Sequence, residues 1–166
     1  MKMLSRKLGN FCLKNNIVIT TAESCTAGLI ASTIAQTPGS SAWLESGFVV
    51  YSAKAKNSIL GVSLDTIKEH DITSINVSAE MALGAIKKGT ANVALAVTGV
   101  AGPSGGTDEI PVGTVCMSWI MKANNEVCTH DEIKVFKGSR NQIRQDVVKY
   151  MLEQLMKYYQ EDFKLN

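Results

Sequence analysis

The chain has 166 residues, of which 45% are hydrophobic, and its formal net charge is only +2. This length fits one domain over residues 1–166, and so small a charge argues against nucleic acid or an anionic membrane as a partner. No stretch approaches the roughly 18 apolar residues that span a bilayer, and the N-terminus lacks the long apolar segment of a secretory signal.

The cysteines and histidines argue against a bound metal. The four cysteines lie far apart and form no Cys-x-x-Cys pair, and the chain has only two histidines. We therefore predict no metal site and no cofactor. Free thiols persist in a reducing compartment, so the predicted location is the cytoplasm.

Hydrophobic patterning predicts helices that alternate with strands along most of the chain. The predicted elements are a helix over 2–15, a strand over 16–20, a helix from near Ser24 through Ile34, a turn at 38–41, a strand over 44–52, a helix over 53–60 ending at Gly61, helices near 64–70 and 77–89, strands over 92–98, 112–122 and 126–136, and a helix from about Arg140 to Tyr159.

Helices before, between and after the strands predict three α/β/α layers. Residues 112–122 and 126–136 adjoin across a short turn, so these two strands are expected to pair antiparallel. The predicted fold class is therefore α/β, a three-layer α/β/α sandwich with a mixed, mostly parallel sheet.

The most informative segment is the strand-to-helix turn at 21–28, which reads TAESCTAG. Open α/β proteins bind ligands at the carboxyl ends of their strands, and a helix N-terminus favours negative charge. Ser24 is thus a potential nucleophile beside an anion site. The alternative is that Ser24 or Thr21 only caps the helix.

A second candidate loop follows the continuous apolar run at 93–97, which is typical of a strand buried on both faces. The loop has four glycines within eight residues, which let a backbone approach a ligand closely and form an anion nest. It matches neither a Walker A motif nor Gly-x-Gly-x-x-Gly. A plain surface turn is the alternative. The four glycines are Gly99, Gly102, Gly105 and Gly106.

Several separated motifs resemble the CinA C-terminal domain family. Their order and spacing hold from about residue 4 to about residue 158. The motifs are TAESCT at 21–26, PGSS at 38–41, GFVVYS at 47–52, Lys56, LGV at 60–62, VTGVAGP at 97–103, GGT at 105–107 and PVGTV at 111–115.

The resemblance implies an activity that composition and periodicity do not point to. It is hydrolysis of the carboxamide of nicotinamide mononucleotide to nicotinic acid mononucleotide and ammonia. The implied partner is this small-molecule pyridine mononucleotide. The resemblance also implies a Ser24 nucleophile, a Lys56 base, a Tyr51 that positions Lys56 or the substrate, and Thr98 as a further active-site hydroxyl.

Elementary chemistry is consistent with these roles. A serine hydroxyl is a weak nucleophile without a nearby base, and a lysine can act as that base only if desolvation or a neighbouring cation lowers its pKa. The two histidines lie at no motif position, so a Ser-His-Asp arrangement is not expected. Without the resemblance, Lys56 would be interpreted as a solvated surface lysine.

Further residues are candidates for substrate binding. Arg140 and Arg144 lie one helical turn apart, and a guanidinium suits phosphate because it donates two hydrogen bonds. Without the resemblance they would be interpreted as a solvated helix start; the resemblance implies a substrate-binding arginine in this stretch, with Arg140 as the first choice. Glu23 is either an acceptor for Lys56 or Arg140, or a first-turn helix carboxylate. The full set is Glu23, Thr26, Gly28, Gly99, Gly102, Gly105, Gly106, Arg140 and Arg144.

Two departures from the family pattern stand out. The family commonly has Gly-Gly where this chain has Ala27-Gly28, and the added methyl either narrows the pocket or changes only helix packing. Residues 72–77 are also looser than the pattern. Many family members carry a preceding molybdopterin-binding-like domain, whose activity is expected to be absent here.

Two function classes stay open at this point. One is an amidohydrolase, and the other is a non-catalytic nucleotide- or partner-binding module of the competence- and damage-inducible family. Joint retention of Ser24, Tyr51, Lys56 and Thr98 favours the enzyme. A homo-oligomer, in the first instance a dimer, is also expected.

Overall fold

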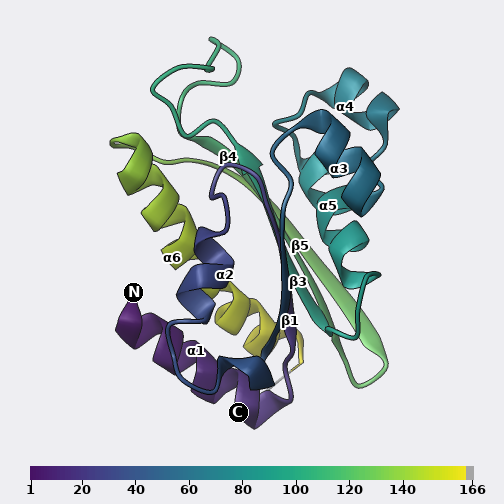
Figure 1. Ribbon diagram of the computed structural model, residues 1–166, viewed down its shortest axis with the longest axis vertical. Coiled ribbons are helices and arrows are strands. Elements are labelled where there is room, and N and C mark those ends of the chain that lie inside the picture. The colour runs from purple at the N-terminus through teal and green to yellow at the C-terminus, as the bar shows by residue number, and fades with distance from the viewer. Residues whose placement is uncertain (164–166) are drawn as a thin grey trace.

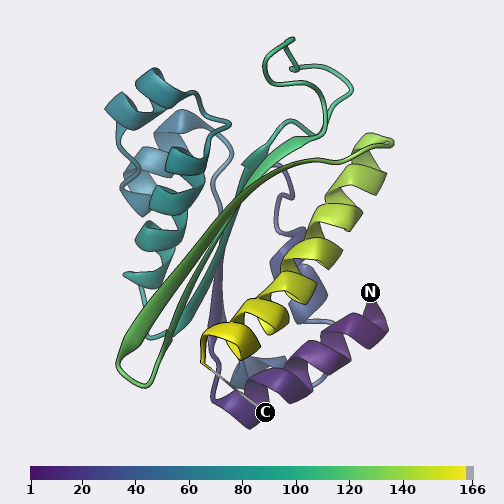
Figure 2. The ribbon, with the colours of Figure 1, turned by 180° about the vertical axis from the view of Figure 1, so that it is seen from behind.

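The computed structural model describes residues 1–163, which form a five-stranded sheet with helices on both faces (Figure 1 and Figure 2). The strands are β1 (Ile19–Glu23), β2 (Leu44–Val49), β3 (Val93–Gly99), β4 (Thr114–Ala123) and β5 (Glu126–Val135). The helices are α1 (Lys2–Asn15), α2 (Leu29–Ile34), α3 (Ala53–Leu60), α4 (Leu64–His70), α5 (Ile75–Ile86) and α6 (Arg140–Asp162), with a 3-10 turn η1 (Ser40–Ala42).

The strands lie in the order β2-β1-β3-β4-β5. Strand β1 pairs in parallel with β2 and β3, whereas β4 pairs antiparallel with both β3 and β5. Only β4 therefore runs against the other four strands. The predicted mixed, mostly parallel sheet is confirmed, and the carboxyl ends of β1, β2 and β3 meet at one edge, where α/β proteins bind ligands.

Two apolar clusters pack on opposite faces of the sheet. Helices α1, α2 and α6 cover one face, with Leu8, Ile30 and Val147 in its cluster. Helices α3, α4 and α5 cover the other face, where Leu60 and Met81 are buried. Figure 1 and Figure 2 show these helices on either side of the sheet, so the predicted three layers are confirmed.

The element boundaries differ from the sequence prediction around the first turn. Strand β1 begins at Ile19 because Asn16, with φ of 53°, ends α1 in a left-handed conformation. Helix α2 begins at Leu29 and not near Ser24, because Ala27 and Gly28 have left-handed φ values of 50° and 87°. The Ser24 N–H instead donates to the Val97 carbonyl at 3.0 Å and extends the pairing of β1 with β3.

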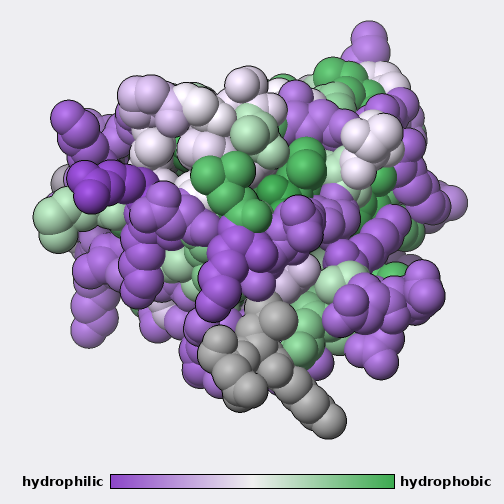
Figure 3. Space-filling view, turned by 90° about the horizontal axis from the view of Figure 1, so that it is seen from below, coloured by the Kyte–Doolittle hydropathy of each residue, from purple (hydrophilic) through white to green (hydrophobic). Residues whose placement is uncertain are grey.

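Among the described residues, no helix is both long enough and apolar enough to cross a bilayer. Figure 3 shows the end of the molecule opposite the glycine loop, where hydrophilic side chains surround smaller hydrophobic areas. The candidate site lies at the other end.

Candidate active site

Ser24 and Lys56 meet at the carboxyl edge of the sheet. Ser24 follows β1, and Lys56 lies in the first turn of α3, the helix that follows the neighbouring parallel strand β2. The Lys56 Nζ stands 2.9 Å from the Ser24 Oγ. The Ser52 hydroxyl accepts from the Ala55 N–H and fixes the start of α3, so the lysine side chain is held against the serine.

Lys56 is fully buried, and burial lowers its pKa from 10.5 to about 8. Its Nζ also donates to the carbonyl oxygens of Val50 at 2.8 Å and Tyr51 at 3.3 Å. A neutral amine has two N–H bonds and one lone pair. With both N–H bonds on the two carbonyls, the lone pair is left for the Ser24 hydroxyl, so the neutral lysine can accept that proton.

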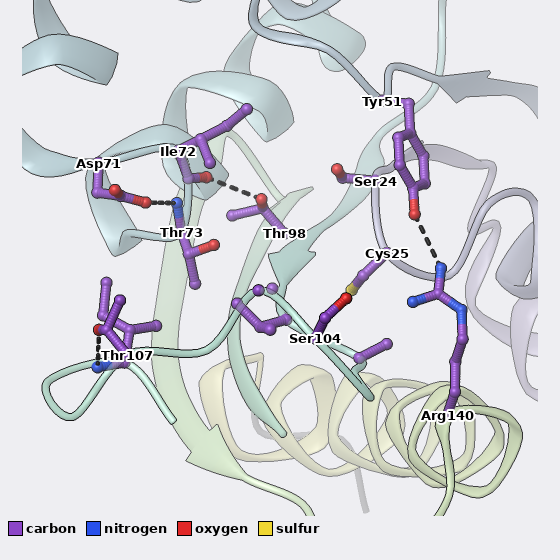
Figure 4. A pocket seen from close by; sticks show the side chains of 15 residues that line it. Ser24, Cys25, Tyr51, Asp71, Ile72, Thr73, Thr98, Ser104, Thr107 and Arg140 are labelled. Carbon is purple, nitrogen blue, oxygen red and sulfur yellow. Dashed lines mark hydrogen bonds between the residues drawn. The ribbon is translucent and has the colours of Figure 1, made fainter. Parts of the chain in front are cut away.

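A cavity of about 370 Å³ opens above Ser24 (Figure 4). Six of the residues predicted from the sequence line it, whereas Lys56 lies behind Ser24. The six lining residues are Ser24, Tyr51, Thr98, Gly99, Gly105 and Arg140. The two loops singled out in the sequence therefore share one cavity.

Arg140 links α6 to Tyr51, which follows β2, and to the glycine loop that follows β3. From the first turn of α6, it donates to the Tyr51 hydroxyl at 2.9 Å and to the Gly102 carbonyl at 2.7 Å. Figure 4 shows the Tyr51 ring directed toward the guanidinium. The Tyr51 hydroxyl therefore hydrogen-bonds to Arg140, whereas the Tyr51 carbonyl hydrogen-bonds to Lys56.

The end of β3 is held to the segment after α4. The Thr98 hydroxyl donates to the Ile72 carbonyl at 2.8 Å. At the last residue of β3, a Cβ added to Gly99 would stand 2.6 Å from the Thr114 carbonyl oxygen. Glycine at this position therefore lets the loop fold back against β4.

Six predicted residues are not on the cavity wall: Glu23, Thr26, Gly28, Gly102, Gly106 and Arg144. The buried Glu23 carboxylate accepts from the N–H groups of Ile30 at 3.0 Å and Ala31 at 2.9 Å. Glu23 is therefore not a first-turn helix residue: it ends β1, and its carboxylate accepts from the first turn of α2 across the intervening turn. No hydrogen bond joins it to Lys56 or Arg140, which are both among the described residues. Arg144 donates to the Thr26 carbonyl at 2.7 Å.

Sequence reasoning missed part of the wall. Asp71 and Thr73 come from the connection between α4 and α5, and Ser104 and Thr107 come from the glycine loop. Thr73 falls in the segment 72–77, which departs from the family pattern, and Thr107 falls in the GGT motif, whereas no signal marked Asp71. Cys25 also lines the cavity, but burial raises the pKa of its thiol to about 12, so it stays protonated near neutral pH.

The family to which this protein belongs is shown by matches that span nearly the whole chain. A model described as the CinA C-terminal domain matches residues 1–159. The chain belongs to this family. It is 40% identical over 159 residues to the nicotinamide-nucleotide amidohydrolase PncC of Escherichia coli, and the match covers 96% of this chain and 94% of that protein.

Solved structures of the CinA C-terminal domain family have the same fold. The competence/damage inducible protein CihA from Agrobacterium tumefaciens superposes with a TM-score of 0.84 at 38% identity, covering 93% of each chain. The competence damage-inducible protein A from Klebsiella pneumoniae superposes with a TM-score of 0.87 at 30% identity, covering 94% of each chain.

Proposed function

We propose that this protein hydrolyses the carboxamide of nicotinamide mononucleotide, giving nicotinic acid mononucleotide and ammonia, in pyridine nucleotide salvage. The 40% identity to PncC over nearly the whole chain supports the substrate. The observation that carries the chemistry is the buried Lys56, whose Nζ lies 2.9 Å from the Oγ of a serine on the cavity wall. This combination favours the enzyme over a non-catalytic binding module.

In the proposed mechanism, neutral Lys56 takes the proton of the Ser24 hydroxyl while the Oγ attacks the carboxamide carbon. The tetrahedral intermediate collapses, and Lys56 returns a proton to the departing nitrogen, which leaves as ammonia. An ester between Ser24 and the nicotinoyl group remains. Water, deprotonated by Lys56, attacks this ester and releases the acid and the free serine.

Arg140 is the proposed phosphate ligand. Arg140 lies on the cavity wall, and two of its nitrogens already donate to oxygen atoms, the Tyr51 hydroxyl and the Gly102 carbonyl. A guanidinium binds phosphate through paired hydrogen bonds. Binding energy from this remote group can position the carboxamide against Ser24. Gly99 and Gly105, which also line the cavity, are proposed to contact the substrate through the backbone.

The decisive experiment is Ser24→Ala with a coupled ammonia assay. Because the nucleophile is lost, ammonia release from the mononucleotide should fall to background while the fold persists. Ser32→Ala, an exposed serine of α2, is the matched control and should keep full turnover. Near-normal turnover by Ser24→Ala would exclude the proposed nucleophile.

Substrate truncation tests the phosphate site. The mononucleotide should be hydrolysed far faster than nicotinamide riboside, and Arg140→Ala should shrink this preference. Equal rates on both substrates would contradict the phosphate site. Tight binding of the mononucleotide without ammonia release would favour the non-catalytic module.

We also propose a homodimer formed through β5. This strand lies at the edge of the sheet, and Val127, Ile133 and Val135 on one of its faces are 62%, 61% and 51% exposed. An antiparallel pairing centred on His130 would place Glu126 opposite the partner's Lys134 and Val127 opposite the partner's Ile133. A pairing centred on Asp131 would instead place Asp131 opposite the partner's Asp131, and the two carboxylates would repel each other.

Charge exchange tests this register by sedimentation analysis. Glu126→Lys should weaken the dimer because it places a lysine opposite the partner's Lys134. Combining Glu126→Lys with Lys134→Glu should restore the dimer. A monomeric wild type, or a double variant no better than the single one, would contradict the pairing. We further propose that the protein forms one domain and acts in the cytoplasm.

A further inference from the structure

Asp71 has a backbone conformation that aspartate rarely adopts. It directly follows α4, with φ of 70° and ψ of 156°. This region is populated almost only by glycine, because a Cβ clashes with the backbone there. Strained positions of this kind cluster at functional sites. Asp71 also lines the cavity that holds Ser24 (Figure 4).

Hydrogen bonds hold the strained turn in place. The Asp71 Oδ1 accepts from the Thr73 N–H at 2.9 Å, and the Asp71 carbonyl accepts from the Ser74 hydroxyl at 2.9 Å. Glycine would form the same backbone without strain. What aspartate adds is a carboxylate on the cavity wall.

The cavity wall has a separated pair of charges. Of its lining residues, only Asp71 and Arg140 carry a charge. In Figure 4, Ser24 and Thr98 lie between these two side chains. A ligand with one negative and one positive group suits such a wall. The substrate of the proposed function has this pattern, because its phosphate is negative and its pyridinium ring is positive.

We propose that Asp71 is a specificity-determining residue that selects the positively charged pyridinium ring. This inference rests on the proposed function. The protein would therefore prefer the oxidised mononucleotide to the reduced 1,4-dihydro form, whose ring is neutral but whose carboxamide, ribose and phosphate are the same. A carboxylate attracts a cation over several ångströms without direct hydrogen bonding, so the ring need not touch Asp71.

The test compares the two forms of the mononucleotide in Asp71→Asn, which keeps the acceptor for the Thr73 N–H but removes the charge. We expect kcat/KM for the oxidised form to fall about fivefold, the size typical of a partly exposed ion pair, mainly through KM. The value for the reduced form should not change. Because the two rings differ in intrinsic reactivity, the measured quantity is the change in their ratio on substitution.

Two further variants separate charge from structure. Asp71→Gly should lose the same discrimination and raise the Tm, because glycine relieves the strained φ. Asp65→Asn, an exposed carboxylate on α4, is the matched control and should leave the ratio unchanged. An equal loss for both mononucleotides in Asp71→Asn would overturn the proposal and indicate a hydrogen bond to the ribose or a structural role.

Calorimetry measures the affinity for each mononucleotide directly, so it tests the inference without turnover. Ser24→Ala protein should bind the oxidised form more tightly than the reduced form, and adding Asp71→Asn should remove this difference. Such a result without any ammonia release by the wild type would sustain charge selection while the proposed hydrolysis failed. Equal affinities in the Ser24→Ala protein would overturn charge selection even if hydrolysis occurs.

Discussion

The two sides of the Ser24 turn each bury one charged side chain, and the two are surrounded very differently. On the α2 side, Glu23 is fully buried and its carboxylate accepts four hydrogen bonds. On the α3 side, Lys56 is also fully buried, but one of its three partners is the Ser24 hydroxyl, which faces the cavity.

The partners decide what each buried charge does. The donors to Glu23 are two threonine hydroxyls and two N–H groups of α2, all inside the fold, so this carboxylate stabilises the start of a short helix. Burial brings the pKa of Lys56 to about 8, within reach of neutral pH, and its partner is a nucleophile. Equal burial therefore supports structure in one case and chemistry in the other.

The largest expected effect tests the chemical side. Lys56→Met should lower kcat at least about 100-fold, because general base catalysis contributes at least that much. Lys56→Arg should not rescue turnover, since arginine does not lose its proton. Ammonia release measures both, and Lys54→Met, an exposed lysine on the same helix, is the matched control. An active Lys56→Arg protein would mean that Lys56 supplies only charge.

The next effect tests the structural side. Glu23→Gln should lower the free energy of unfolding by about 2–4 kcal/mol, because an amide cannot accept from all four donors. Urea denaturation measures the loss, and Glu153→Gln on the exposed face of α6 is the control. The kcat of the folded fraction should fall less than in Lys56→Met. A stable Glu23→Gln protein with no turnover would reverse the roles assigned to the two sides.

A third effect follows from the lowered pKa of Lys56. The base must be neutral, so kcat/KM should rise with pH, and at pH 7 it should be about tenfold below its plateau, which lies above the pKa of about 8. The direction follows because a higher pH removes the proton from a lysine. A profile that is flat between pH 6 and pH 9 would exclude Lys56 as the titrating base.

The sequence could predict the order of elements because hydrophobic periodicity is local. The family resemblance implied that Lys56 is the base for Ser24, and the structure brings the two together because each follows a strand of the same parallel pair. The sequence could not predict where α2 begins, because the left-handed conformations of Ala27 and Gly28 decide this. Glu23 accepts hydrogen bonds from the first turn of α2, so its partners depend on where this helix begins. The sequence therefore could not decide whether Glu23 accepts from Lys56 or Arg140 or stabilises the helix.

The Asp71 wall was missed for a different reason. Asp71 reaches the cavity only because the segment after α4 is bonded to the end of β3, through the Thr98 hydroxyl and the Ile72 carbonyl. This contact joins residues 26 positions apart. No local pattern reports such a juxtaposition, whereas the glycine loop could be recognised by its composition alone.

The smallest expected effect concerns the turn between the two sides. Ala27 has a φ of 50°, is exposed, and is not among the residues that line the cavity. The methyl group thus costs backbone strain without narrowing the pocket. Ala27→Gly should raise the free energy of unfolding by about 0.5 kcal/mol, since relief of strain outweighs the greater entropy of glycine in the unfolded chain.

Urea denaturation and the ammonia assay together test this prediction. Turnover of Ala27→Gly should equal that of the wild type, because no cavity atom changes. Ala79→Gly, inside α5, is the matched control and should lose about 0.5–1 kcal/mol, because helical glycine carries only the entropic cost. If Ala27→Gly instead lost stability or changed KM, the Ala27 methyl group would contribute to the fold or to substrate binding. The assignment of Glu23 to structure and of Lys56 to chemistry would then need revision.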